Sequence, residues 1–520
     1  MSYSGSMNKG WSEEPGKSRL IILLIFLLAL FLRLYDLGGE SIWLDEAASI
    51  SFSKGTLFQV INRISGLTYN ICLYFWIRLF GSSEVSARLP SAIFGSLVVF
   101  MIYKVGRSLF NKKTGMASSL LAGLSIFYIQ YSQEARSYIL TTLLTLVSMY
   151  FFIRLLEKRK LCISIGYMVS NILLLYAHPF AILIPLVQNL YFFTLSPRSN
   201  GRKGNSLKIW LFLQLPLFIY FFQGISSYVA VFYRVKETMV DLWIPRPAPI
   251  SILVSFLEFS GSLSLMVCFF ISSLFSLLIF EKIRGKLNFK IILGSLADFR
   301  WNMYFSDIQS NYFLILWLFF PILALFIFSV FFIPSYWTRY LIISSPAFYL
   351  LAGHGISNLK DFFTKLILLT AIVVFSLINI HSYWRDVNKE PWRDAAGYVQ
   401  RKALPKDSLI FIAPYARCPF DYYFTRKDVQ EIATTPDPGF IAITGEKIRL
   451  LNEIIGAKER VWVILYHYRD PRGLLKEYFS SHFQISVKKD YSRARFLNLK
   501  FQNFINTQEI AIEVYLLKKK

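Results

Sequence analysis

Charged residues are scarce in this chain: Asp, Glu, Lys and Arg make up 17% of its 520 residues, and 55% of the residues are hydrophobic. A soluble protein of this size has about a quarter charged residues. Apolar runs long enough to cross a hydrocarbon core of about 30 Å recur along most of the sequence. The composition therefore excludes an ordinary soluble protein and predicts a polytopic membrane protein.

Cysteine is scarce as well, and nucleotide-binding motifs are missing. The four cysteines (Cys72, Cys162, Cys268 and Cys418) include no C-x-x-C pair, which argues against a zinc or disulfide framework. No G-x-x-x-x-G-K-[ST] sequence occurs, which argues against an ATP-driven pump. The net charge of +24 does not indicate nucleic acid binding, because the cytoplasmic loops of membrane proteins collect Lys and Arg.

The apolar runs predict an α-helical polytopic membrane protein with about eleven transmembrane helices. The predicted spans are 20–35, 89–106, 115–131, 137–156, 161–177, 179–195, 209–225, 256–280, 311–333, 338–356 and 366–384. The segment NICLYFWIRLF at 70–80 is typical of an amphipathic helix that lies at the membrane surface.

The basic residues predict the orientation of these spans. Segments 103–113, 154–160, 196–208 and 281–290 are rich in Lys and Arg and fall on one side of the membrane. The positive-inside rule places that side in the cytoplasm, which puts the N-terminus inside. An acidic first loop at 36–88 and everything after residue 384 then lie outside the cytoplasmic membrane.

The sequence changes character after residue 384, which divides the chain into a membrane domain (1–384) and an outer domain (385–520). Strand-like runs occur at 408–413, 461–467 and 510–517, and helix-like stretches at 392–404 and 471–483. Strands alternating with helices predict a small extracytoplasmic α/β domain.

Several charged side chains are predicted to share the outer face, close to the membrane surface. The carboxylates are Asp45, Glu46 and Glu134, and the cationic or imidazole groups are Arg33, Arg136, His178, Arg246 and Arg339. Guanidinium groups meet phosphate oxygens in a bidentate geometry, and a carboxylate can take the proton of an attacking hydroxyl. This set of groups fits a reaction on a lipid-linked phosphosugar.

Simpler roles for the same residues stay open at this point. Asp45 can cap a helix that starts at the following residues. Glu134 and Arg136 can pair in a solvated turn, and any one arginine can reach lipid headgroups with its long side chain. His178 can end a helix, or bind a divalent metal together with a carboxylate, although one histidine is a weak metal signal.

Five stretches together resemble the GT-C glycosyltransferases, above all the prokaryotic relatives of protein O-mannosyltransferases and of the lipid A aminoarabinose transferase. The stretches are LRLYDLGGESIWLDEAASIS (32–51), YSQEARSYILTTLL (131–144), HPFAILIPL (178–186), WTRYLIISSPAFYLL (337–351) and PWRDAAGYV (391–399). The resemblance covers the whole membrane part in the same order.

The resemblance implies a cell-envelope enzyme that takes a hexose or pentose from a polyprenyl-phosphate donor with inversion at the anomeric carbon. It implies that Asp45 is the base, with Glu46 and Glu134 positioning the acceptor or a cation. Arg339 corresponds to an arginine expected near the lipid phosphate, and the remaining outer cations are candidate substrate-binding groups. No cofactor is implied with certainty, and a divalent metal stays open.

The sequence departs from the family pattern in ways that leave the acceptor open among lipid, glycan and protein. LTYNICLYFWIRLF at 67–80 replaces an H-P-P-L-Y-type stretch, and the W-W-D signature of oligosaccharyltransferases is missing. No MIR-like outer insertion is present either. A transporter or flippase for lipid-linked sugars is the alternative function; it requires ionisable groups at mid-membrane, and Glu258 is the main candidate.

Overall fold

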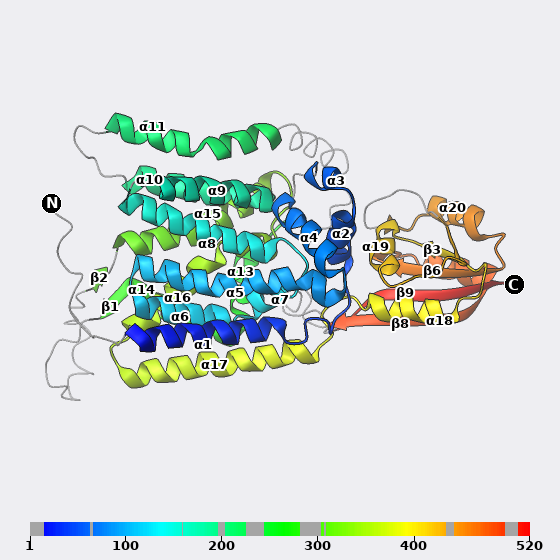
Figure 1. Ribbon diagram of the computed structural model, residues 1–520. Helices are drawn as coiled ribbons and strands as arrows, with labels where there is room; N and C mark the ends of the chain where they lie inside the picture. The colour runs from blue at the N-terminus through cyan, green and yellow to red at the C-terminus, as the bar shows by residue number, and fades with distance from the viewer. Residues whose placement is uncertain are drawn as a thin grey trace.

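The computed structural model of the protein describes residues 15–62, 66–158, 160–195, 203–224, 244–280, 303–305, 308–432, 441–494 and 508–520. Two of the basic segments that carry the predicted orientation, 196–208 and 281–290, lie mostly or wholly outside these residues. Helices dominate up to residue 385, and a small sheet follows (Figure 1).

The helices of the first part form a bundle whose long members run side by side (Figure 1). They are α1 (Pro15–Leu34), α2 (Leu44–Lys54), α3 (Leu57–Ile61), α4 (Leu67–Phe80), α5 (Glu84–Leu109), α6 (Lys112–Gly123), α7 (Ile126–Ser132), α8 (Tyr138–Glu157), α9 (Leu161–Ala177), η1 (Pro179–Ile182), α10 (Leu183–Leu195), α11 (Lys203–Leu213), α13 (Ile250–Ser260), α14 (Leu263–Leu277), α15 (Ile308–Phe331), η4 (Thr338–Ile343), α16 (Ser345–Asn358) and α17 (Phe362–Arg385).

Four described helices are long and apolar enough to cross a membrane: Glu84–Leu109, Tyr138–Glu157, Gln309–Phe331 and Phe362–Arg385. The bent pair α13 and α14 makes a fifth if the two helices cross together. Shorter apolar helices span Leu161–Ala177, Pro179–Thr194 and Leu215–Gly224. Several apolar helices are thus confirmed, whereas the number of eleven and the orientation stay predictions.

The predicted span at 256–280 is not one straight helix. Helix α13 ends at Ser260, α14 begins at Leu263, and the two axes differ by 94°. Gly261 lies between them at φ 90°, and a Cβ there would come 2.5 Å from Ile126 Cγ2, so the bend requires glycine. The predicted spans 115–131 and 338–356 are broken too, into α6 with α7 and η4 with α16. An apolar run cannot reveal such breaks, because its hydropathy continues through them.

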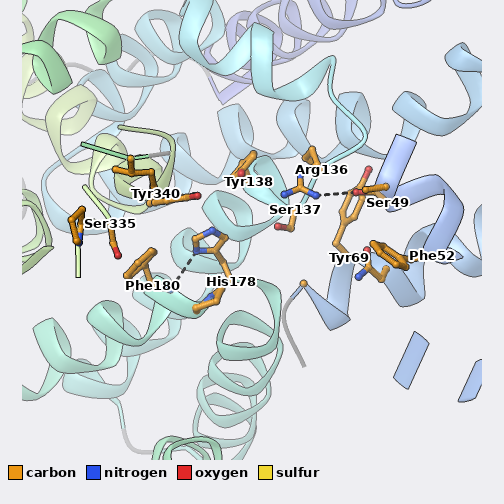
Figure 2. A pocket seen from close by; sticks show the side chains of 16 residues that line it. Ser49, Phe52, Tyr69, Arg136, Ser137, Tyr138, His178, Phe180, Ser335 and Tyr340 are labelled. Atoms are coloured by element: carbon orange, nitrogen blue, oxygen red, sulfur yellow. Dashed lines mark hydrogen bonds between the residues drawn. The ribbon is translucent and has the colours of Figure 1, made fainter. Parts of the chain in front are cut away.

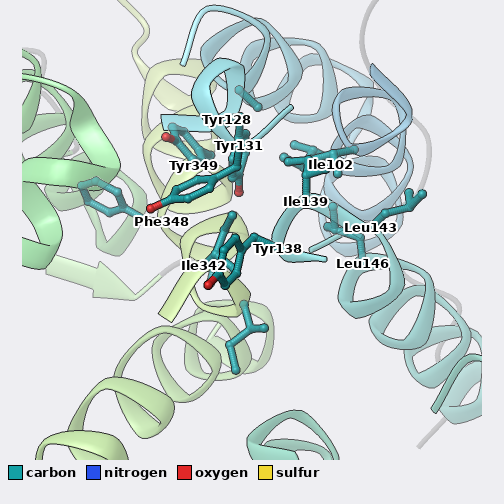
Figure 3. Close-up of a cluster of buried hydrophobic side chains, with 14 of the residues drawn as sticks. Ile102, Tyr128, Tyr131, Tyr138, Ile139, Leu143, Leu146, Ile342, Phe348 and Tyr349 are labelled. Carbon is teal, nitrogen blue, oxygen red and sulfur yellow. The ribbon is translucent and has the colours of Figure 1, made fainter. Parts of the chain in front are cut away.

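Small residues and buried hydroxyls hold the centre of the bundle together. A Cβ on Gly353 of α16 would lie 2.1 Å from Ser118 Oγ of α6, so these two helices touch at a glycine. Figure 3 shows Tyr128, Tyr131 and Tyr349 gathered in the same buried cluster. The Tyr128 and Ser345 hydroxyls are 2.8 Å apart, which joins α7 to α16 and fixes the end of the bundle that carries the polar loops.

The last part of the chain contains a five-stranded sheet with the strand order β4-β3-β6-β9-β8. Its strands are β3 (Ser408–Phe411), β4 (Gln430–Ile432), β6 (Arg460–Tyr466), β8 (Phe483–Ala494) and β9 (Gln508–Lys519). β3 pairs in parallel with β4 and β6, whereas β9 is antiparallel to β6 and β8. The helices here are α18 (Trp392–Lys402), η5 (Pro414–Ala416), α19 (Arg417–Asp421), α20 (Gly445–Ile455) and α21 (Leu474–His482). The predicted mixture of strands and helices is confirmed.

Two further strand pairs are short: β1 (Leu278–Phe280) with β2 (Met303–Phe305), and β5 (Ile441–Ala442) with β7 (Tyr468–Arg469).

Helices α2, α3 and α4 lie at the end of the bundle that faces the sheet (Figure 1). Polar contacts join this region to residues after α17. Arg393 pairs with Glu84 at 2.6 Å, and the backbone N–H of Ile42 donates to the hydroxyl of Tyr423 at 2.7 Å. The first acidic loop is therefore held between the bundle and the sheet.

Candidate active site

The adjacent carboxylates Asp45 and Glu46 lie in the first turn of α2. The helix begins after Trp43, so Asp45 is inside the helix and does not cap it. The backbone N–H of Trp43 donates to Glu46 Oε2 at 3.4 Å, so Glu46 satisfies one of the free donors of the helix start. Successive helical residues point in directions about 100° apart, and the two carboxylates therefore have different neighbours.

Glu46 is sealed inside the protein among cations. Its side chain has no solvent exposure, and Arg88 of α5 meets both of its oxygens at 2.7 and 2.8 Å. Lys389 Nζ lies 3.3 Å from Oε2, and the backbone N–H of Ala135 donates to Oε1 at 2.8 Å. Burial works to raise the pKa of Glu46, but Arg88 and Lys389 outweigh it and lower the pKa to about 2. These contacts are those of a structural ion pair.

Asp45 is one third exposed and faces two arginines more loosely. Arg339 Nη1 lies 3.3 Å from Asp45 Oδ2, and Arg136 Nη2 lies 3.8 Å from the same oxygen. Arg136 Nη1 also donates to the backbone oxygen of Asp45 at 3.3 Å and to Ser49 Oγ at 3.2 Å. The guanidinium of Arg339 sits over the ring of Trp337 at 5.3 Å, a cation–π distance. This group combines an accessible carboxylate with two positioned cations.

Glu134 is buried in the turn between α7 and α8, and its Oε2 has no hydrogen-bond partner among the described residues. Burial raises the pKa of Glu134 to about 7, against the opposing charge of Lys389. A carboxyl of this kind exists in both protonation states near neutral pH. Glu134 lies in the same turn as Arg136, and after burial the charges of Lys389 and Glu46 act on it most strongly.

A cavity of about 530 Å³ opens beside Arg136, which lines it, whereas Asp45 and Arg339 are not among its lining residues (Figure 2). It lies between α2 and α4 on one side and the start of α8, η1 and the segment before η4 on the other. Its lining is Ala48, Ser49, Phe52, Gly66, Tyr69, Asn70, Arg136, Ser137, Tyr138, His178, Pro179, Phe180, Ile244, Pro334, Ser335 and Tyr340. Most of these side chains are aromatic or neutral and polar, which suits a hydroxylated ligand.

His178 faces this cavity with one tautomer favoured. Its Nδ1 accepts the backbone N–H of Phe180 at 3.3 Å, which leaves the proton on Nε2. Burial, together with the charges of Arg136 and Arg339, lowers the pKa of His178 to about 3. The imidazole is therefore a neutral hydrogen-bond donor near pH 7. It packs 5.3 Å from the ring of Tyr340.

Two of the predicted substrate-binding residues do not line this cavity. Arg33 is fully buried, and its guanidinium donates to the backbone oxygens of Ala122 and Gly123 at 3.2 Å each, at the C-terminal end of α6. These are the contacts of a helix cap. Arg246 is exposed in the segment before α13, and no ion pair joins it to a described residue. The guanidinium of Arg33 is thus committed to the backbone, whereas the role of Arg246 stays a prediction.

Arg88 and Lys389 are the site-region residues that sequence reasoning missed. Arg88 precedes the predicted span at 89–106, and Lys389 follows the span at 366–384, where both look like ordinary flanking cations. They lie 42 and 343 residues from Glu46 in sequence, so no local pattern pairs them with it. Among the described residues, no group of three or more His, Cys, Asp or Glu side chains is arranged to hold a metal ion.

The sequence matches one family model, and the structure matches several solved proteins. The family model is that of the dolichyl-phosphate-mannose-protein mannosyltransferases, and it matches residues 67–222. No curated protein has a sequence that matches this chain.

Solved structures similar to this one include ArnT from Cupriavidus metallidurans in the apo state, with 12% identity, a TM-score of 0.58, and 97% of this chain and 98% of that chain covered. The same protein bound to undecaprenyl phosphate has 10% identity, a TM-score of 0.56 and the same coverage. The archaeal oligosaccharyltransferase AglB from Archaeoglobus fulgidus, in complex with an inhibitory peptide and a dolichol-phosphate, has 10% identity and a TM-score of 0.54 over 88% of this chain and 70% of that chain. At these identities the likeness shows a shared fold.

Proposed function

Because the chain has the fold of the GT-C membrane glycosyltransferases, we propose that it transfers a sugar from a polyprenyl-phosphate donor to an acceptor hydroxyl at the outer face of the cytoplasmic membrane. The observation that carries the proposal is Asp45, a partly exposed carboxylate set between two arginines beside a polar cavity. The relative that is bound to undecaprenyl phosphate supports a lipid phosphate as part of the donor.

In the proposed reaction, the acceptor oxygen attacks the anomeric carbon in line with the bond to phosphate, which inverts that carbon. Asp45 takes the proton of the acceptor hydroxyl while the carbon–oxygen bond to phosphate breaks. The electron pair of the broken bond leaves with the lipid phosphate, whose charge becomes more negative. Arg136 and Arg339 stabilise this developing charge, because they already surround the position of an anion.

Asp45 and the donor phosphate compete for the same two arginines under this proposal. In the absence of donor, the carboxylate of Asp45 occupies them at 3.3 and 3.8 Å. A phosphate binds a guanidinium at least as well, since it can accept two hydrogen bonds side by side. Arrival of the donor would therefore release Asp45 from the arginines and leave its carboxylate oxygens available to the acceptor hydroxyl.

The cavity is assigned to the reacting sugar and the acceptor. Its lining includes the rings of Tyr138, Phe180 and Tyr340, which suit the C–H faces of a sugar. The hydroxyl of Ser49 and the amide of Asn70 also line it. Neutral His178 supplies a further N–H donor. The sugar is a hexose or pentose, and lipid, glycan and protein acceptors all carry a suitable hydroxyl.

The decisive experiment measures transfer and lipid binding on the same variants. Purified protein in detergent is given a panel of labelled polyprenyl-phosphate sugars, and binding of undecaprenyl phosphate is measured separately. Asp45→Asn should lose transfer by about 10²–10⁴-fold. The same variant should bind undecaprenyl phosphate more tightly than the wild type, because the competing carboxylate is gone, whereas Arg339→Gln should bind it more weakly. Asp386→Asn, which removes a carboxylate of similar exposure after α17, is the matched control.

Each half of this result can contradict the proposal. Transfer that persists in Asp45→Asn would show that another group is the base. Weaker lipid binding in Asp45→Asn would mean that the carboxylate attracts the donor phosphate, through a cation bound between the two, and does not compete with it.

A transporter is the second candidate, because the broken helix pair α13 and α14 carries the buried Glu258. If the protein is a transporter, labelled lipid-linked sugar should cross the membrane of vesicles that contain the reconstituted protein, and the sugar should stay attached to its lipid.

A further inference from the structure

Lys389 reaches into the candidate site from the segment that joins α17 to the sheet. Its side chain is 8% exposed, and its Nζ donates to the backbone oxygen of Gln133 at 2.7 Å and to Glu46 Oε2 at 3.3 Å. Gln133 belongs to the turn that presents Glu134 and Arg136, and Glu46 belongs to α2. One ammonium group therefore joins the two elements whose side chains meet at Asp45.

Glu390, the next residue, joins the same helix to the sheet. Its side chain is 2% exposed, and its Oε1 accepts Arg493 Nη1 of β8 at 2.8 Å. Its Oε2 accepts the indole N–H of Trp392 at 3.0 Å and the backbone N–H of Leu44, the first residue of α2, at 3.4 Å. A negative charge at this position also suits the N-terminus of a helix.

We propose that Lys389 and Glu390 are positioning residues that hold the start of α2, and with it Asp45, beside the 133–137 turn, so that the domain after residue 384 helps to shape the candidate site. This inference rests on the proposed function. Asp45 follows Leu44 directly, and the start of α2 is held by Glu390 on one side and through Glu46 and Lys389 on the other. Neither residue touches the cavity, so both act through α2 and the 133–137 turn.

The size of the expected effect follows from geometry. The Asp45 ion pairs are long, at 3.3 and 3.8 Å, so they alone do not fix the carboxylate. A displacement of about 1 Å in a catalytic group can cost about 10²-fold in rate. Loosening α2 should therefore lower the catalytic rate more than it lowers the affinity for the lipid phosphate, because Arg339, one of the two arginines that attract the phosphate, lies on η4.

The test compares Lys389→Met and Glu390→Gln with the conservative variant Lys389→Arg. Lys488→Met removes an exposed lysine from β8 and serves as the matched control. Transfer kinetics are normalised to the fraction of protein that binds undecaprenyl phosphate, which removes any loss caused by unfolding. We expect kcat to fall by about 10- to 100-fold in the first two variants, with the donor KM near the wild-type value and most of kcat restored in Lys389→Arg.

Hydrogen exchange supplies a readout that does not depend on catalysis. Peptides covering 41–54 and 131–138 should exchange faster in Lys389→Met and Glu390→Gln, while a peptide covering 95–109 of α5 exchanges as in the wild type. Unchanged exchange in the first two peptides would overturn the inference, and so would wild-type kcat. Failure of the wild type to transfer sugar from any donor would count against the proposed function alone, because the exchange pattern would still decide the positioning role. If Lys389→Met does not fold, Glu390→Gln, which keeps the size of the side chain, decides the same question.

Discussion

Asp45 and Glu46 are neighbours on one helix, yet their surroundings differ in almost every physical respect. Glu46 is fully buried, and Arg88 holds it through two short contacts, whereas Asp45 is one third exposed and touches its arginines at 3.3 and 3.8 Å. Five donors fill the oxygens of Glu46, and a ligand would find no room there. The comparison teaches that one residue of this acidic pair holds the site together while its neighbour is available for chemistry.

The largest effect that separates the two residues is on stability. Glu46→Gln leaves Arg88 and Lys389 buried without their counter-charge, and breaking a buried pair in this way costs about 3–5 kcal/mol. Asp45→Asn removes a partly exposed pair, which is worth about 1 kcal/mol or less. Thermal unfolding in detergent should therefore show a large drop in Tm for Glu46→Gln and little change for Asp45→Asn. Equal drops in both variants would show that the two carboxylates are structurally equivalent.

The second prediction contrasts Glu46 with Glu134 by the pH dependence of stability. The pKa of Glu134 is raised from 4.5 to about 7 in the folded state. Between pH 4.5 and 7 the folded protein therefore keeps a proton on Glu134 that the unfolded chain has lost. The contribution of Glu134 to the free energy of unfolding is present below pH 4.5 and is lost as pH rises through about 7. The pKa of Glu46 is lowered from 4.5 to about 2, so its contribution is present above pH 4.5 and is lost as pH falls toward 2.

The variant Glu134→Gln isolates the pH-dependent contribution of Glu134 to stability. Between pH 4.5 and 7 the wild type should lose up to about 3 kcal/mol relative to the variant, and the Tm difference between the two proteins measured at several pH values reports it. A Tm difference that stays constant over this range would show that Glu134 keeps an ordinary pKa and is solvated.

The sequence was sufficient for the outlines of both parts of the molecule. The expected helix at 137–156 is α8, from Tyr138 to Glu157, and the expected strand at 461–467 is β6, from Arg460 to Tyr466. These elements are predictable because hydropathy and strand alternation are local properties of the chain. The bend at Gly261 was not predictable, since a single glycine within an apolar run has many uses.

The candidate site was predictable as a list of residues but not as an arrangement. The outer-face reasoning grouped Asp45, Arg136, His178 and Arg339, and the structure brings these four together, although their roles stay predictions. It placed both Asp45, as the base, and Glu46, as a group that positions the acceptor or a cation, in contact with the substrate, because their different partners come from distant parts of the chain. The choice between a ligand contact and a structural contact depends on such long-range partners, which one sequence does not reveal.

The smallest predicted effect concerns His178, which lines the cavity. Its pKa is lowered to about 3, first by burial and then by Arg136 and Arg339, so the imidazole stays neutral from pH 5 to 8. His178→Asn keeps an acceptor for the Phe180 N–H but moves or removes the Nε2 donor, which should cost about 1 kcal/mol of substrate binding. The pH profile of kcat/KM should keep its shape in this variant. A wild-type inflection near the usual histidine pKa that disappears in His178→Asn would mean that His178 titrates, and that the two arginines no longer face it once they hold the donor phosphate.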